Sequence, residues 1–463
     1  MTEVAKSTSS RREFLKQTGR IATATTLTGL AVPRVHAAED NTIQVVLIGC
    51  GGRGTGAAAN AMKVKQGPIK LIAMADVFED KLQRSYTNLK KQFPDQVDVP
   101  RDRQFIGFDG YQKAMDLLKP GDIAIFTTPL AFRWVHFTYA INKGLNVFME
   151  KPLTADGPTS RRMIELAKKS VAKNLKVGVG LMSRHARPLQ ELHARIQDGE
   201  IGDIASMFAY RMAGRVGSAF SEKWPGTPSE LLYQIRKFHS FIWASGGCFN
   251  DFYIHVIDHS CWMKNAWPVK AQALGGRHYK LTPQGNPYVD QNFDVYSVEY
   301  TFADGGKLIL DGRCMPGCAN IYKSYLLGTK GMAIGSRAGD CGAPSSTYTG
   351  LKPDPTKMIW QSNTPHEERN PYDNEWNDLV GAIRSDTPYN EVERGVTASA
   401  VSSLGRKAAH TGVEMTLDEF LNSEQVYAPG VDKFTMDSPA PVQADSDGRY
   451  PIPQPGLITD REY

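Results

Sequence analysis

The order of apolar and polar residues divides this chain into two parts. Between residues 42 and 185, short apolar runs alternate with longer segments whose apolar residues recur every three or four positions. The runs, which predict buried strands, cover residues 42–48, 69–76, 122–129, 146–150 and 175–182. The recurring segments predict helices at residues 111–118, 132–143 and 159–173. Because such alternation requires right-handed crossovers between parallel strands, we expect an α/β domain with a doubly wound parallel sheet over residues 42–185.

A different pattern begins after about Pro188, where apolar and polar residues alternate singly. Segments such as IASMFAYRM and VYSVEYTFADGGKLILDGRC predict antiparallel strands, with ADGG as a hairpin turn. Residues 186–425 are therefore expected to form an α+β domain with a large, open, mainly antiparallel sheet, whose late helices can pack back on the first domain. Residues 426–463 are rich in proline and lack periodicity, so this tail is expected to wrap over the surface or over a neighbouring subunit.

The first 37 residues have the order of an export signal. Paired Arg11 and Arg12 precede a weakly apolar run over residues 21–35, and the small residue Ala37 follows it. This order predicts a twin-arginine signal peptide, so the chain is expected to be exported folded and to be periplasmic. The alternative is a disordered basic tail.

The charge and hydropathy of the remaining chain exclude two classes of partner. Removal of residues 1–37 takes away six basic and two acidic residues and lowers the formal net charge from +5 to +1, so no nucleic-acid partner is expected. No other apolar run approaches the roughly 20 residues that span a bilayer. We therefore expect no integral membrane segment in the mature chain.

A glycine motif lies between the first apolar run and an alanine-rich helical segment. Gly49, Gly51 and Gly54 form the pattern G-x-G-x-x-G, in which the glycines allow a tight turn, close approach to a pyrophosphate, and close packing of helix on strand. Asp76 ends the next strand 22 residues after Gly54, near the spacing of about 20 for an acid that binds a ribose. The pattern predicts a dinucleotide site that favours NAD over NADP. The alternative for Asp76 is a cap on the following helix.

Lys151 follows a short apolar strand in the segment NVFMEKPLT. An ammonium group at a buried strand end is either salt-bridged scaffolding or a working charge in a cleft. Ligands of doubly wound sheets bind beyond the carboxyl ends of the strands, where Thr128, Pro129 and Glu150 also fall. Lys151 is therefore expected at the mouth of the cofactor cleft.

The segment GGCFNDFYIHVIDHSCWM has helical spacing from about Asn250 onward. Asp251 and His255 are four residues apart and share one face of this helix, and Asp258 and His259 follow one turn later. A carboxylate beside an imidazole raises its basicity and fixes its tautomer, as a general base requires. Such spacing also occurs in purely structural helices, so both interpretations stay open at this stage.

The six cysteines are scattered, without paired C-x-x-C spacing or nearby histidines in a ligand pattern. We therefore expect no metal. Cys314 and Cys318 could close a small disulfide or remain free thiols.

Taken together, GCGGRG, EKP and GGCFNDFYIH make the chain similar to the Gfo/Idh/MocA family, which includes glucose-fructose oxidoreductase and inositol dehydrogenase. The resemblance covers roughly residues 43–421 and implies a Rossmann NAD(P)-binding domain, a substrate and oligomerisation domain, and a dimer or tetramer. It also implies that Lys151 binds the substrate hydroxyl, that His255 accepts its proton, and that Asp251 contacts the substrate and orients the base. One departure is Arg133, which stands where family members often have a histidine.

The candidate site residues fall into three groups. The catalytic group is Lys151, His255 and Asp251. The residues expected to bind the cofactor are Gly49, Gly51, Gly52, Arg53, Gly54, Asp76, Thr128, Pro129, Glu150 and Lys151. Arg184, by its place in the resemblance, and Tyr233, Arg236 and Trp243, as basic or aromatic side chains before the catalytic helix, are candidates for substrate binding. Arg184 can also be part of a surface salt bridge, and the aromatic residues can be part of an ordinary core.

The resemblance implies an NAD(P)-dependent oxidoreductase that transfers a hydride between the nicotinamide and a hydroxyl or ketone of a sugar or polyol. Because the periplasm offers no free NAD pool, the cofactor is expected to be tightly bound and recycled on the enzyme. One alternative is a redox-neutral NAD-dependent glycoside hydrolase or epimerase. Another is a non-catalytic carbohydrate-binding or sensing protein, against which the presence of Lys151, Asp251 and His255 argues.

Overall fold

The structure, a computed structural model, describes residues 41–463 except 279–280, 283 and 340. The expected signal peptide, residues 1–37, lies outside the described residues. Within the part of the chain that is described, no helix is both long and apolar enough to cross a bilayer.

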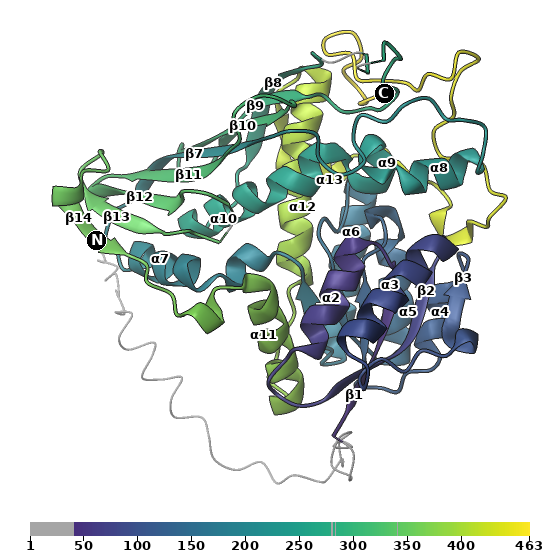
Figure 1. Cartoon of the computed structure of the whole chain (residues 1–463). Coiled ribbons are helices and arrows are strands. Elements are labelled where there is room, and N and C mark those ends of the chain that lie inside the picture. The colour runs from purple at the N-terminus through teal and green to yellow at the C-terminus, as the bar shows by residue number, and fades with distance from the viewer. Residues whose placement is uncertain (1–40, 279–280, 283, 340) are drawn as a thin grey trace, which may run out of the picture. The chain divides into compact units, whose positions relative to one another are not determined.

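The parallel sheet is confirmed, and it has six strands in the order β3-β2-β1-β4-β5-β6, of which β3 was not predicted (Figure 1). The strands are β1 (Ile43–Ile48), β2 (Ile69–Asp76), β3 (Gln104–Ile106), β4 (Ile123–Phe126), β5 (Asn146–Met149) and β6 (Val177–Val179). The connecting helices are α2 (Gly52–Met62), α3 (Glu79–Gln92), α4 (Gly110–Met115), α5 (Arg133–Lys143) and α6 (Gly157–Ala172). The strands are added outward in one direction from β1 to β3 and in the other from β4 to β6. This reversal of strand order between the parallel neighbours β1 and β4 places a ligand crevice beyond their carboxyl ends.

The second sheet has nine strands in the order β14-β13-β12-β11-β7-β10-β9-β8-β15. They are β7 (Ile204–Ala213), β8 (Lys270–Gly276), β9 (Val295–Thr301), β10 (Lys307–Cys314), β11 (Ile321–Gly328), β12 (Gly331–Ser336), β13 (Ser346–Thr349), β14 (Met358–Gln361) and β15 (Met415–Thr416). Every pairing is antiparallel except that of β7 with β10, and ADGG joins β9 to β10, as expected. The prediction of a large, mainly antiparallel sheet is confirmed.

One long helix, α12 (Val392–Thr411), packs against both sheets. Val392 and Val396 pack into the core of the parallel sheet, whereas Leu404 and Ala408 pack into the core behind the second sheet. The other helices of this half are α7 (Arg187–Gln197), α8 (Glu230–Arg236), α9 (Ile242–Ser245), α10 (Ile254–Lys264), α11 (Pro371–Ser385) and α13 (Leu417–Asn422). Because α12 is buried along its length, it fixes the two sheets relative to each other.

The tail, residues 426–463, packs on its own chain and is drawn in yellow beside α8 and α9 in Figure 1. Tyr427, Val431, Val442 and Tyr450 are buried in one cluster with Phe241. The tail therefore wraps over the surface of the same chain, which was one of the two placements expected for it.

We predict that Leu404→Ala lowers the free energy of unfolding by about 2–5 kcal/mol, because the side chain is fully buried in α12 and its removal leaves a cavity. Leu351→Ala is the matched control, since 61% of Leu351 is exposed. Chemical denaturation measures both changes. Equally small losses of stability in the two variants would show that the packing of Leu404 does not stabilise the fold.

Candidate active site

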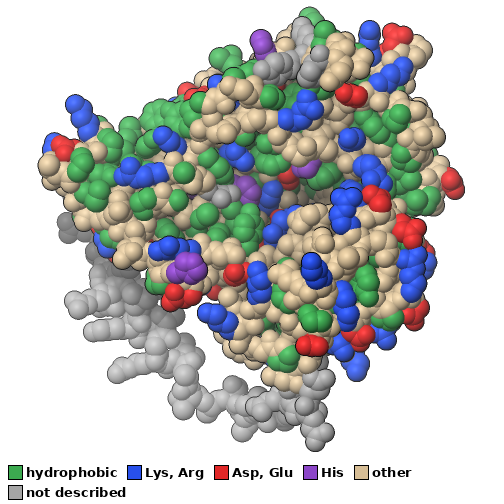
Figure 2. Space-filling model, viewed as in Figure 1, with side chains coloured by type: hydrophobic (Ala, Val, Ile, Leu, Met, Phe, Trp, Pro, Cys, Tyr) green, Lys and Arg blue, Asp and Glu red, His purple; other side chains and the backbone are tan. Residues whose placement is uncertain are grey.

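A cavity of about 850 Å³ lies beyond the carboxyl ends of the parallel strands. Its walls come from the loop after β1, the loop after β4, the end of β5 and the segment before α10. In Figure 2, charged and histidine side chains gather in a recess on this side of the protein. All ten residues expected to bind a cofactor line this cavity, and so do Lys151, Asp251 and His255.

The glycine loop has the geometry that a pyrophosphate needs. Gly49 has a φ of +94°, and a Cβ on Gly54 would lie 2.1 Å from the carbonyl oxygen of Gly49. By contrast, a Cβ on Gly51 or Gly52 would meet no atom within 4 Å, so the backbone is open to a ligand at the start of α2. The loop therefore fits a dinucleotide, whose phosphates the free N–H groups of a helix N-terminus can bind.

Asp76 binds the backbone of the glycine loop through its carboxyl group. Its Oδ2 accepts a hydrogen bond from the Cys50 N–H at 2.6 Å, and its Oδ1 accepts one from the Phe78 N–H at 2.9 Å. Burial raises the pKa of Asp76, and these two hydrogen bonds oppose that rise. Lys81 and Arg84 line the same cavity as Asp76, and the charge of Lys81 also opposes the rise in the pKa of Asp76.

Arg53 and Glu150, both predicted cofactor contacts, form an ion pair across the cavity. The Nε of Arg53 lies 2.5 Å from the Oε1 of Glu150, and its guanidinium lies 4.6 Å from the centre of the Tyr372 ring. Burial, with the charge of Glu150, raises the pKa of the neighbouring Glu375 well above its ordinary value. The charge of Arg53 is therefore compensated by the carboxylate of Glu150.

Arg133, the departure from the family pattern, is a buried structural residue. Its guanidinium donates to the carbonyl oxygens of Phe126 (2.6 Å) and Thr128 (2.9 Å), and burial lowers its pKa to about 10. His136, nearly one helical turn later, also lines the cavity, and its Nδ1 lies 3.4 Å from the Thr128 hydroxyl. A histidine of α5 therefore lines the cavity, at a position that the sequence analysis missed.

At the inner end of the cavity, Lys151 meets a carboxylate of the second half of the chain. Its Nζ donates to the carbonyl oxygen of Asp251 at 2.6 Å and to Oδ1 of the same residue at 3.2 Å. The Oδ2 of Asp251 lies 3.0 Å from the Nε2 of His239. Although burial opposes ionisation, the charge of Lys151 and the hydrogen bond from His239 hold the pKa of Asp251 well below its usual value. Asp251 is therefore a carboxylate at neutral pH.

The tautomer of His239 follows from its other neighbour. The backbone N–H of Ser218 donates to Nδ1 at 3.1 Å, so in a neutral ring the proton is on Nε2 and points to Asp251. His239 also lines the cavity. Its contact with Asp251 joins positions 12 residues apart, beyond the reach of helical spacing.

Asp251 lies in a π-helical segment, Phe249–Tyr253, that leads directly into α10. An α-helix was expected from about Asn250, so the start of this helix has a wider turn than predicted. Asp251 and His255 both line the cavity. Asp258 and His259, one turn later, do not line the cavity. Asp258 binds Arg184, and the Nε2 of His259 lies 2.9 Å from the Ser324 hydroxyl.

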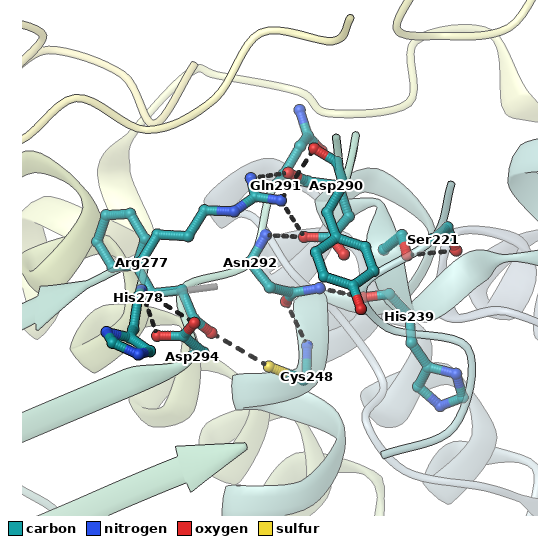
Figure 3. Close-up of polar contacts among 12 residues, drawn as sticks. Ser221, His239, Cys248, Arg277, His278, Asp290, Gln291, Asn292 and Asp294 are labelled. Atoms are coloured by element: carbon teal, nitrogen blue, oxygen red, sulfur yellow. Dashed lines mark hydrogen bonds and ion pairs between the residues drawn. The ribbon is translucent and has the colours of Figure 1, made fainter. Parts of the chain in front are cut away.

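Asn292 connects the two segments that carry His239 and Asp251, as Figure 3 shows. Its Nδ2 donates to the carbonyl oxygen of His239 at 2.7 Å, and its Oδ1 accepts from the Cys248 N–H at 2.7 Å. Burial raises the pKa of the adjacent Asp290 to about 6, and the Oδ1 of Asp290 accepts the N–H of Asn292. The buried side chain of Asn292 therefore holds the backbone of His239 close to the segment that leads to Asp251.

The four residues proposed for substrate binding do not line the cavity, so that interpretation is corrected for each. Arg184 binds Asp258 through Nε (2.9 Å) and Nη2 (2.7 Å) in a buried ion pair. Arg236 binds Asp80 on the surface, and the Nε1 of Trp243 donates to Gln234 at 2.7 Å. The hydroxyl of Tyr233 donates to the carbonyl oxygen of Glu222. Each side chain instead binds another residue of the protein.

The cysteines are free thiols, with Cys314 buried and Cys318 exposed, so the alternative without a disulfide holds.

Comparison with known protein sequences gives one curated relative, and no family model matches the chain. A curated inositol 2-dehydrogenase of Corynebacterium glutamicum is 26% identical over 125 residues, which are 27% of this chain and 35% of the relative. The match thus spans about a third of that relative's length.

Solved structures match over more of the chain. The aldose-aldose oxidoreductase of Caulobacter crescentus, complexed with glycerol, has a TM-score of 0.60 and 16% identity. The scyllo-inositol dehydrogenase of Lactobacillus casei, with bound NAD(H) and scyllo-inositol, has a TM-score of 0.58 and 20% identity. A levoglucosan dehydrogenase in complex with NADH and levoglucosan has a TM-score of 0.60 and 17% identity. Each match covers 81% of this chain and 99% of the other, and at these identities it establishes a shared fold.

The buried His136 makes stability depend on pH. Burial, with the charge of Arg133, lowers the pKa of its imidazole to about 3, whereas an unfolded histidine titrates near 6.5. Below about pH 6.5 the unfolded chain therefore binds a proton that the folded chain does not, and stability falls as the pH falls. Between pH 7 and pH 5 we predict that the wild type loses about 2 kcal/mol more than His136→Phe, measured by denaturation at both pH values. Equal losses would contradict a neutral, buried imidazole.

The assignment of Arg184 to structure gives a second prediction. Arg184→Met leaves the Asp258 carboxylate buried without its partner and should lower the free energy of unfolding by about 3–5 kcal/mol. The double variant Arg184→Met/Asp258→Leu should recover most of that loss. A single variant with unchanged stability and a raised KM would instead support a substrate contact.

Proposed function

We propose that this chain, which shares the fold of the Gfo/Idh/MocA oxidoreductases, is an NAD-dependent oxidoreductase that acts on a CH–OH group of a sugar or polyol. One observation carries the proposal: a dinucleotide loop and the trio Lys151, Asp251 and His255 line the same cavity. The solved structures with this fold include proteins whose ligands are nicotinamide nucleotides and polyols or sugars.

Lys151 is the group that we assign to the substrate oxygen. An ammonium group has three N–H donors, and two of them point to Asp251. The third is then available to an oxygen in the cavity, where it would stabilise the negative charge that develops as a hydroxyl loses its proton. Asp251 fixes the ammonium group at this place.

His255 is the group that we assign to the proton. It lines the same cavity, 9% exposed, from the first turn of α10. An imidazole whose ordinary pKa lies near neutrality can accept a hydroxyl proton and return it. When bound, the nicotinamide would supply or accept the hydride.

The choice of NAD rests on Asp76, since a carboxylate at the end of β2 accepts ribose hydroxyls and repels a 2′-phosphate. Lys81 and Arg84 in the same cavity could instead favour NADP, so titration of the apoprotein with both nucleotides is the test. Tighter binding of NADP would overturn the NAD assignment.

We also propose that the protein is periplasmic, that it binds its cofactor tightly and that it forms a homo-oligomer. The twin-arginine pattern of residues 9–16 supports export of the folded, cofactor-loaded protein to the periplasm. Where no free NAD exists, a tightly bound cofactor has to be recycled by a second sugar or ketone. The second sheet carries Leu274, 77% exposed, and Val295, 38% exposed, which is consistent with a homo-oligomer that pairs through this sheet.

We predict that Lys151→Ala lowers the rate of cofactor reduction by sugars about 100- to 10,000-fold, because the developing alkoxide loses its charged donor. His255→Gln should have an effect in the same range. NAD affinity should change little in either variant. Lys168→Ala is the matched control, since its side chain is 67% exposed and pairs with Glu165.

The measurement is the absorbance of reduced nicotinamide after addition of a panel of sugars, polyols and glycosides, together with product analysis. Normal rates in Lys151→Ala would overturn the assignment. Cleavage or epimerisation without lasting reduction would move the protein to the redox-neutral class. If the NAD-loaded wild type showed neither cofactor reduction nor a product with any compound of the panel, the result would favour a non-catalytic binding protein.

A further inference from the structure

The tail forms part of the wall of the cofactor cavity. Val431 and Asp432, in the short 3-10 helix Val431–Lys433, line the cavity, and so does Phe434 directly after it. The parallel sheet and the tail are more than 250 residues apart in sequence at this wall. The cavity is therefore completed by a segment that the doubly wound domain does not contain.

Phe434 shows which part of the cavity the tail covers. Its ring packs edge-on against Phe108 and Phe132, with 6.3 Å between ring centres in each case. Phe108 follows β3 and Phe132 follows β4, and the strands between them are β2, which ends at Asp76, and β1. An acid at the end of β2 marks the adenosine ribose in this type of domain. The tail therefore covers the adenosine half of the proposed dinucleotide site.

The far end of the tail is anchored by a buried ion pair. Glu462 and Arg406 of α12 both have fully buried side chains, and they are joined by two hydrogen bonds, from Nε at 2.9 Å and from Nη2 at 2.8 Å. The Nδ1 of His410 lies 2.8 Å from the same carboxylate, and the hydroxyl of Tyr427 donates to it. Although burial opposes ionisation, the charge of Arg406 holds the pKa of Glu462 well below its usual value. Such a pair is stable only while both partners stay in place.

Arg406 also contacts the two segments that carry the catalytic residues. Its Nη1 donates to the carbonyl oxygen of Gly246, in the turn before the helix of Asp251, at 3.0 Å. Its Nη2 donates to the carbonyl oxygen of Ala155, four residues after Lys151, also at 3.0 Å. The tail anchor and the Lys151–Asp251 contact therefore share one guanidinium group.

We propose that residues 426–463 act as a strap over the adenosine half of the cofactor, latched by Glu462 on Arg406, so that the nucleotide leaves only after the strap undocks. This inference rests on the proposed function, because it assumes that the cavity binds a dinucleotide. It assigns the slow release of cofactor, which an exported enzyme requires, to named residues: Phe434 at the wall and Glu462 at the latch.

The test is the dissociation rate of NAD from the full-length protein. The protein is loaded with labelled NAD, excess unlabelled NAD is added, and the loss of label is followed. Glu462→Gln and Phe434→Ala should each release NAD at least tenfold faster than the wild type. Asp447→Asn is the control, since this tail residue is exposed and its loss of charge leaves latch and wall intact, so its rate should not change.

Two features of this experiment keep its outcomes separate. Glu462→Gln leaves the Arg406 charge buried without its partner and can unfold the protein. Phe434→Ala leaves the pair of Glu462 and Arg406 in place, so if Glu462→Gln does not fold, the NAD release rate of Phe434→Ala decides the test. Wild-type release rates in the folded variants would overturn the strap while leaving the proposed function intact. A wild type that binds neither NAD nor NADP would overturn both.

Discussion

The ion pair between Lys151 and Asp251 is the interaction on which the proposed site depends. An ammonium group at the end of a buried strand is costly unless a carboxylate compensates it, and the adjacent Glu150 is paired with Arg53. The compensating group comes from the π-helical turn before α10, 100 residues later in the sequence. The pair thus requires both halves of the chain to be in place, and α12 and Arg406 hold them there. The role that we propose for the lysine rests on the same geometry, since it lines the cavity that also contains the glycine loop.

Local patterns were enough to predict the two sheets, the glycine loop and part of the cavity lining. Gly49, Gly51 and Gly54 are close in sequence, and the places of Asp76 and Lys151 in the cavity follow from their position at the ends of parallel strands. Asp251 and His255 could be paired by helical spacing alone, although the turn between them proved to be π-helical.

What the sequence analysis did not predict depends on contacts between distant residues. Arg184 and Trp243 are residues of the kind that bind sugars, but their partners are Asp258 and Gln234, which no spacing rule connects to them. The contacts of Asn292 and Arg406 were missed for the same reason. His136 had a usable signal, since it lies on the helix after the TP dipeptide, nearly one turn beyond Arg133.

The cavity, the tail and the expected export support one account of cofactor use. A chain that folds around its cofactor before export has to retain it afterwards, and a wall formed by the tail offers a physical means of doing so. Arg406, which anchors that tail, contacts the backbone before Asp251 and after Lys151. In the proposed account, retention of the cofactor and alignment of the site would therefore depend on the same buried charge.

The central claim is hydride transfer between a carbon of the substrate and the bound nicotinamide. It is tested most directly by incubating the NAD-loaded protein with sugars and polyols that carry deuterium on carbon, and analysing the recovered nucleotide by mass spectrometry. The account predicts reduced nicotinamide that carries one deuterium atom from at least one substrate. Turnover of such a substrate with no deuterium in the nucleotide, and with none moved within the product, would contradict it.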